Sequence, residues 1–186
     1  MRMMQIRHVC LDDILNYEGN DTIDPDRRLI WVKSAVFRLN SINEIFVFLR
    51  EMHSGDSHYH KISIDSQIAN SYDPSTNVDD NVVTEEAAIA TSFRLLQEIQ
   101  PYDFIAKMKI GTRTDYKYKP KGTRKFECIE ISGTEDIGQF EARTITKLVR
   151  LIDSPTGYTA GFISVSCFED PTGENTGSHR FVRVVK

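Results

Sequence analysis

The order of local patterns between residues 84 and 168 constrains the fold more than any other feature of this chain. Apolar residues recur at helical spacing over residues 84–99, and Pro101 then ends the helix. Three strand-like segments follow, then a second helical pattern over residues 139–153 and a near-continuous apolar run. The four predicted strands cover residues 103–110, 114–119, 125–132 and 161–168. The sequence therefore predicts the order helix, three strands, helix, strand.

This order determines the fold class. A helical connection between the third and fourth strands requires at least one parallel or mixed pairing, because antiparallel neighbours need only a short turn. We therefore expect an α/β or α+β fold with a central mixed β-sheet and an αβββαβ core flanked by helices.

The first 80 residues show a different pattern and predict a small α/β extension. Residues 29–39 are rich in β-branched and aromatic residues, which predicts a strand. Ser41 and Glu44 have capping-box spacing and predict a helix to about Met52. Residues 58–65 alternate like a strand, and residues 70–80 are acidic and turn-rich. We therefore predict an N-terminal lobe with an acidic linker over residues 1–80 and a core over residues 81–186.

The charge of the chain is unevenly distributed. Its 186 residues contain 23 basic and 27 acidic residues, a formal net charge of −4, which argues against a general nucleic-acid coat. Between Lys107 and Lys125, however, eight basic residues accompany the single acid Asp115. Such a surplus with interleaved tyrosines is typical of a surface that binds phosphates and stacks on bases. The residues predicted to contact nucleic acid are Lys107, Lys109, Arg113, Tyr116, Tyr118, Lys119, Lys121, Arg124 and Lys125. A solvated hairpin at the sheet edge, protected by lysines, is the alternative.

Other function classes lack support in the sequence. No apolar stretch approaches the length of a membrane span, and the N-terminus meets acid before any apolar run long enough for a secretion signal, so we expect a cytoplasmic protein without a membrane partner. The three cysteines lack CxxC spacing, which favours buried thiols over a zinc site. The motifs of serine hydrolases, P-loop proteins, Rossmann dehydrogenases and zincins are missing from the sequence.

Two acids lie on consecutive predicted strands. Asp115 lies at the start of the second strand and Glu130 within the third, fifteen positions later. With the αβββαβ order, these acids resemble the core of the restriction-endonuclease-like superfamily, the PD-(D/E)xK nucleases. The resemblance covers roughly residues 84 to 168. It implies that Asp115 and Glu130 bind Mg²⁺, and that Glu86, or its neighbour Glu85, adds a carboxylate from the first helix.

The lysine of that superfamily has no direct counterpart here. Ser132 stands two residues after Glu130, where the superfamily has the lysine that helps to activate water. Lys117 lies two residues after Asp115 and shares its face of the second strand, so it could supply the ammonium group from the neighbouring strand. The catalytic set that the resemblance implies is therefore Glu86, Asp115, Lys117 and Glu130.

Strand parity makes Glu130 notable. The period of two places Glu130 on the same face as Phe126 and Cys128, so its carboxylate needs a metal, a base or hydrogen bonds to offset desolvation. A salt bridge at the wet end of the strand is the alternative. The leading hypothesis is a nuclease-like protein that contacts DNA or RNA, either as a Mg²⁺-dependent phosphodiesterase or as a descendant that has lost cleavage. The rival hypothesis is a non-catalytic interaction module, such as an immunity or defence-system partner. A second copy of the chain, forming a homodimer, is a further candidate for a binding partner.

Overall fold

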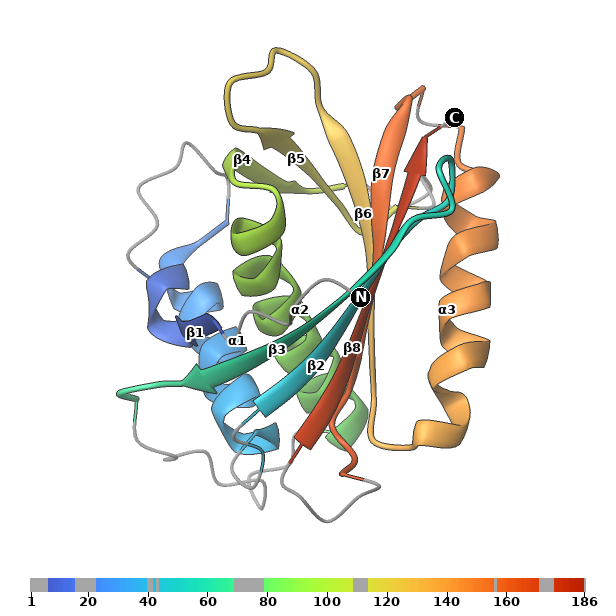
Figure 1. The fold of residues 1–186 in the computed structure, drawn as a ribbon. Helices are drawn as coiled ribbons and strands as arrows, with labels where there is room; N and C mark the ends of the chain where they lie inside the picture. The colour runs from blue at the N-terminus through green and yellow to red at the C-terminus, as the bar shows by residue number, and fades with distance from the viewer. Residues whose placement is uncertain are drawn as a thin grey trace.

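The computed structural model describes residues 7–15, 23–39, 42, 44–68, 79–108, 114–155, 157–170 and 176–185. These residues form one eight-stranded mixed β-sheet with helices on both faces (Figure 1). The strands are β1 (Arg7–Cys10), β2 (Glu44–Glu51), β3 (Ser57–Asp65), β4 (Tyr102–Lys107), β5 (Tyr116–Pro120), β6 (Glu127–Thr134), β7 (Ala160–Cys167) and β8 (Thr176–Val185).

The strands are ordered β1-β3-β2-β8-β7-β6-β5-β4 across the sheet. Strands β4, β5 and β6 form an antiparallel meander, and β7 lies parallel to β6. Strand β8 pairs antiparallel with β7 and parallel with β2, so the N-terminal strands continue the same sheet. The order of elements from α2 to β7 is the αβββαβ order that the sequence predicts, and the α/β class is confirmed.

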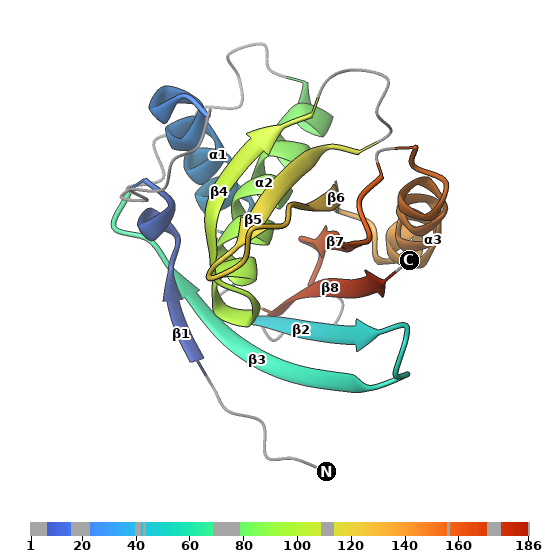
Figure 2. The ribbon, with the colours of Figure 1, turned by 90° about the horizontal axis from the view of Figure 1, so that it is seen from above.

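The three α-helices of the described residues divide unequally between the two faces of the sheet. Helices α1 (Pro25–Arg38) and α2 (Asp80–Ile99) lie on one face together with the short 3-10 helix η1 (Leu11–Ile14), whereas α3 (Ile137–Ile152) lies on the other (Figures 1 and 2). Helix α3 packs mainly against β6 and β7. The β4–β5 part of that face therefore has no helix over it among the described elements.

Close packing between α2 and β6 depends on a glycine. A Cβ atom at Gly133 would lie 2.4 Å from the backbone oxygen of Thr84, a distance that no side chain can accept. Ala88 on α2 is fully buried, and its Cβ atom lies against Gly133 at the same interface. Small residues on both elements thus bring the start of α2 against the end of β6, where the polar groups described below collect.

The predicted strand over residues 29–39 is wrong, because this segment forms most of α1. The Asp24 carboxylate accepts a hydrogen bond from the Asp26 amide, and Pro25 occupies the first turn, so the chain is set for a helix before the β-branched residues begin. Trp31 and Ala35 lie one turn apart and are buried in the main core. This packing outweighs the intrinsic strand preference of the segment.

The predicted helix to Met52 is also wrong, because residues 44–51 form β2. Ile45 and Val47 are buried while Phe46 between them is exposed, which is the alternation of a half-buried strand. Pairing with β3 and β8 on either side satisfies its backbone. The capping-box spacing has no helix to cap here.

A smaller difference concerns the start of α2. The sequence places the cap of this helix at Thr84, but the Asp79 carboxylate caps it by accepting from the Asn81 amide, and Thr84 lies inside the helix. Cys128 and Cys167 are buried free thiols, in line with the prediction from their spacing. No helix in the described part of the chain is both long and apolar enough to cross a membrane.

Candidate functional site

The candidate site lies where β5 separates from β6. The two strands pair only from Tyr116 to Tyr118 on β5, so the second half of β6 has no β5 neighbour. The backbone N–H of Ile131 donates instead to Oδ2 of Asp115 at 2.8 Å. A cleft of about 260 Å³ opens at this point, and its lining comes from α2, β4, β5, β6 and α3: Glu85, Ile89, Lys107, Asp115, Tyr116, Ile131 and Lys147.

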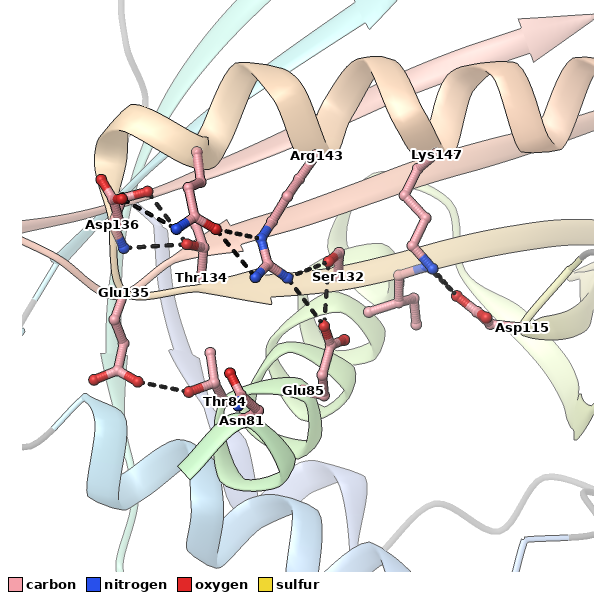
Figure 3. A network of polar contacts seen from close by, with 12 residues as sticks. Asn81, Thr84, Glu85, Asp115, Ser132, Thr134, Glu135, Asp136, Arg143 and Lys147 are labelled. Carbon is pink, nitrogen blue, oxygen red and sulfur yellow. Dashed lines mark hydrogen bonds and ion pairs between the residues drawn. The ribbon is translucent and has the colours of Figure 1, made fainter. Parts of the chain in front are cut away.

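Two carboxylates converge on one cation at this edge. The ammonium Nζ of Lys147, which comes from α3, lies 2.7 Å from Oδ2 of Asp115 (Figure 3) and 3.1 Å from Oε2 of Glu130. The guanidinium of Arg150, one helical turn further along α3, lies 4.0 Å from the same Glu130 oxygen. Asp115 and Glu130 therefore face the α3 side of the sheet and share a single cationic position.

Of the two acids, Glu130 has the more unusual surroundings. Its residue is fully buried, at 0% exposure, and neither carboxylate oxygen receives a hydrogen bond from the described residues. The Lys147 ammonium, 3.1 Å from Oε2, is the nearest cation to this carboxylate, and the Arg150 guanidinium is the next. Burial, and then the negative charge of Asp115, raise the pKa of Glu130 to about 7, against the opposing effect of Lys147. Such a carboxyl group can exchange a proton near neutral pH.

A third carboxylate approaches the cleft from α2. Oε1 of Glu85 accepts from Ser132 Oγ at 3.3 Å and from Nη1 of Arg143 at 3.3 Å, so α2 and α3 are linked across the open edge of β6 (Figure 3). Burial raises the pKa of Glu85 above its usual range. A second hollow of about 210 Å³ lies beyond this link, between the first turns of α2 and α3.

The acid pair offers oxygen ligands of the kind that a magnesium ion takes in proteins. Within the described ranges there is no group of three or more His, Cys, Asp or Glu side chains that could hold a metal. Mg²⁺, however, is commonly held by one or two carboxylates, with waters and substrate phosphates completing its shell. The buried oxygens of Glu130 next to Asp115 fit this kind of site, because a cation offsets their desolvation, as the Lys147 ammonium does here.

Two of the residues predicted for the site lie elsewhere. Glu86 points toward α1, where Oε2 accepts from Ser34 Oγ at 3.1 Å and Oε1 lies 3.1 Å from Arg27. It is Glu85, one position earlier on α2, that lines the cleft. The Lys117 ammonium lies over aromatic rings outside the cleft lining. Because successive helical residues differ in direction by about 100°, neighbouring glutamates on α2 cannot serve the same site.

Sequence reasoning missed the basic residues of α3. Arg143, Lys147 and Arg150 recur at intervals of four and three, so they lie on one face of the helix. That face meets Glu85, Asp115 and Glu130 from three other elements. The helical spacing of three basic residues was a usable signal, but only the folded sheet shows which acids they face.

The basic hairpin is only partly as expected. Lys107, Lys121, Arg124 and Lys125 are exposed, and Lys119 lies 4.0 Å from Asp103. Lys109 and Arg113 lie outside the described residues. The expected stacking of bases on Tyr116 and Tyr118 is wrong, because the two residues are 4% and 0% exposed. The period of two that exposes the lysines of β5 turns its tyrosines into the core.

Comparison of the chain with protein-family models, with curated proteins and with solved structures found no match. The assignment of a function therefore depends on the geometry of the site.

Proposed function

We propose that this protein is a nuclease-like nucleic-acid-binding protein with a Mg²⁺-dependent phosphodiesterase site at the open edge of β6. The observation that carries the proposal is the convergence of Asp115 and the buried Glu130 on one cationic position, where the Lys147 ammonium lies. The αβββαβ order around this edge supports it, because it has the arrangement expected from the resemblance to the PD-(D/E)xK nucleases.

Asp115 and Glu130 would hold the divalent cation, which activates water and stabilises negative charge on a phosphate when it is bound. Glu130 must be ionised to hold the cation, so a bound cation would lower the raised pKa of this carboxyl group. Lys147 and Arg150 supply positive charge beside the acid pair, where it offsets the charge of a phosphate. Glu85 lines the cleft, and its contact with Arg143 links α2 to α3 at the rim.

A second candidate function is that of a protein-interaction module. Helix α3 exposes about half of Ile145, Val149 and Ile152, which recur at helical spacing along one side. An apolar stripe of this kind is typical of a helix that docks against another protein. This function needs neither Asp115 nor Glu130, so the same variants separate the two candidates.

The proposal is tested by cleavage of plasmid, duplex and single-stranded substrates with Mg²⁺ or Mn²⁺. We expect Asp115→Asn and Glu130→Gln to lower the cleavage rate by about 100-fold or more, because each removes a carboxylate that would hold the cation. Glu44→Gln is the matched control, since Glu44 pairs with Lys61 on β2 and β3 at the other end of the sheet. If the folded wild type cleaves no substrate, or if cleavage persists in either variant, the phosphodiesterase proposal is contradicted.

A further inference from the structure

The part of the sheet that α3 leaves uncovered carries an aromatic pair. The rings of Phe104 on β4 and Phe126, just before β6, meet edge to face with centroids 5.4 Å apart. Phe126 is 38% exposed although it belongs to a strand hairpin, where a phenylalanine of this size is normally covered. The Lys117 ammonium lies 5.1 Å from the centroid of Phe126 and 5.8 Å from that of Phe104. An exposed ring and a cation thus occupy one small surface.

The charge around this aromatic pair is almost entirely positive. Lys117 and Lys119 project from β5 on the same side, and the turn between β5 and β6 adds exposed basic residues, namely Lys121, Arg124 and Lys125. Asp103 is the nearby acid, and it lies 4.0 Å from Lys119. Glu127 points to the opposite face, where it binds Arg183. The surface therefore complements a polyanion that also carries flat apolar groups.

The aromatic surface is continuous with the candidate site. Phe126 and Glu130 lie four residues apart and on the same face of the β6 chain, which corresponds to roughly 14 Å along an extended strand. A stacked nucleotide strand has one phosphate per about 3.4 Å, so about four nucleotides would span this interval. Lys117 on β5 lies two residues after Asp115, which directly precedes the strand, and extends the positive surface along the same path.

We propose that the surface formed by Phe104, Phe126, Lys117 and Lys119 binds a single-stranded segment of nucleic acid, with unpaired bases stacked on Phe126 and phosphates on the lysines. The inference rests on the proposed function and specifies its substrate class. A duplex hides the flat faces of its bases within the stack, whereas a single strand offers them to an aromatic side chain. The buried Tyr116 and Tyr118 belong to the other face of the same hairpin and take no part.

The experiment measures binding by fluorescence anisotropy with EDTA present, so that cleavage does not interfere. The probes are a labelled 20-nucleotide oligo-dT, an abasic strand of the same length, and a duplex. Phe126→Ala should weaken binding of oligo-dT by about five- to 150-fold, the range found for removal of one stacking side chain. It should leave the affinity for the abasic strand unchanged, because that strand offers phosphates only, and Phe126→Trp should retain wild-type affinity for oligo-dT.

The chain provides a matched control on the same side of the sheet. Phe46 on β2 is 40% exposed and lies 5.6 Å from the Lys61 ammonium, so Phe46→Ala removes an equivalent ring and cation pair far from the site. We expect Phe46→Ala to bind all three probes like the wild type. Equal affinity of Phe126→Ala and wild type for oligo-dT, an equal loss on the abasic strand, or a wild-type preference for duplex would each overturn the inference.

These outcomes are independent of the phosphodiesterase activity. If the wild type cleaves no substrate but Phe126→Ala shows the expected selective loss, the single-strand surface stands and the catalytic proposal fails. If cleavage depends on Asp115 and Glu130 while Phe126→Ala binds and cleaves as the wild type does, the catalytic proposal stands and the surface is wrong.

Discussion

Strand β6 carries two glutamates three residues apart whose surroundings are opposite. Glu127 faces the α1–α2 side, where Oε1 accepts from Nη2 of Arg183 at 2.7 Å and Oε2 accepts from the hydroxyl of Tyr118. Burial alone would raise the pKa of Glu127, but the hydrogen bonds from Arg183 and Tyr118 hold it below its usual value. Glu130 faces the α3 side without a hydrogen bond from the described residues, and its pKa is raised to about 7.

The two glutamates show how one strand can serve stability on one face and chemistry on the other. A carboxylate with its hydrogen bonds complete stabilises the fold, whereas a buried carboxylate left incomplete costs stability and is retained where a ligand completes it. We therefore assign Glu127 to the structure and Glu130 to the site, an assignment that substitutions at the two positions can break.

The largest effect is expected for Glu127→Gln. The substitution leaves the guanidinium of Arg183 partly buried without its counter-ion, which should cost about 3–5 kcal/mol in the free energy of unfolding. Urea denaturation at pH 7 measures this difference. A loss below about 1 kcal/mol would show that the contacts of Glu127 with Arg183 and Tyr118 contribute little to stability.

Glu130→Gln should change stability in the opposite direction. A rise of the pKa from an ordinary 4.5 to about 7 corresponds to roughly 3 kcal/mol against the charged form in the folded protein. A neutral amide avoids this cost, and Lys147 keeps Asp115 as its partner. We expect Glu130→Gln to be more stable than the wild type by about 1–3 kcal/mol in urea at pH 8. A destabilised variant would identify the pair with Lys147 as a structural salt bridge.

The stability difference between Glu130→Gln and the wild type should increase as the pH rises. The folded state holds the Glu130 proton more tightly than the unfolded state, so the wild type loses stability as the pH rises from about 4.5 to about 7. Below pH 4.5 the carboxyl is neutral in both states and the difference from the variant should vanish. Thermal unfolding of both proteins from pH 4 to pH 8 measures this convergence, and a constant difference would contradict the raised pKa.

The smallest effect is expected at the rim of the cleft. Ser132→Ala removes a hydroxyl that donates to Glu85 at 3.3 Å and accepts from Arg143 at 3.2 Å. The Arg143–Glu85 pair is partly exposed and remains in the variant, so we expect a loss of about 0.5–1 kcal/mol. Urea denaturation at pH 7 checks this value. A loss above about 2 kcal/mol would show that the contacts of Ser132 at the rim stabilise the fold, as those of Glu127 do.

The sequence predicts the C-terminal part of the fold because its signals are local. Turns and period-two patterns set the strands from β4 to β7, and the same parity places Glu130 on one face with Cys128 and Glu127 on the other. The convergence of Asp115 and Glu130 follows from pairing these neighbouring strands in order.

The remainder depends on tertiary contacts that no local pattern contains. The segment that forms α1 has strand-forming residues, but its packing against α2 selects a helix. Lys147 reaches the acid pair because α3 packs back over β6. Glu85 rather than Glu86 faces the cleft because the contact of α2 with Gly133 sets the rotation of that helix. Both facts require the assembled sheet.

The central claim, that the α3 face of β6 is a cation-binding site, is tested most directly by electron paramagnetic resonance of Mn²⁺. The titration uses the folded protein with an uncleavable phosphorothioate strand, comparing wild type, Glu130→Gln and Glu44→Gln. We predict that the wild type and Glu44→Gln remove Mn²⁺ from the free signal and that Glu130→Gln does not. Free Mn²⁺ in all three samples, or equal binding by Glu130→Gln and wild type, would contradict the site.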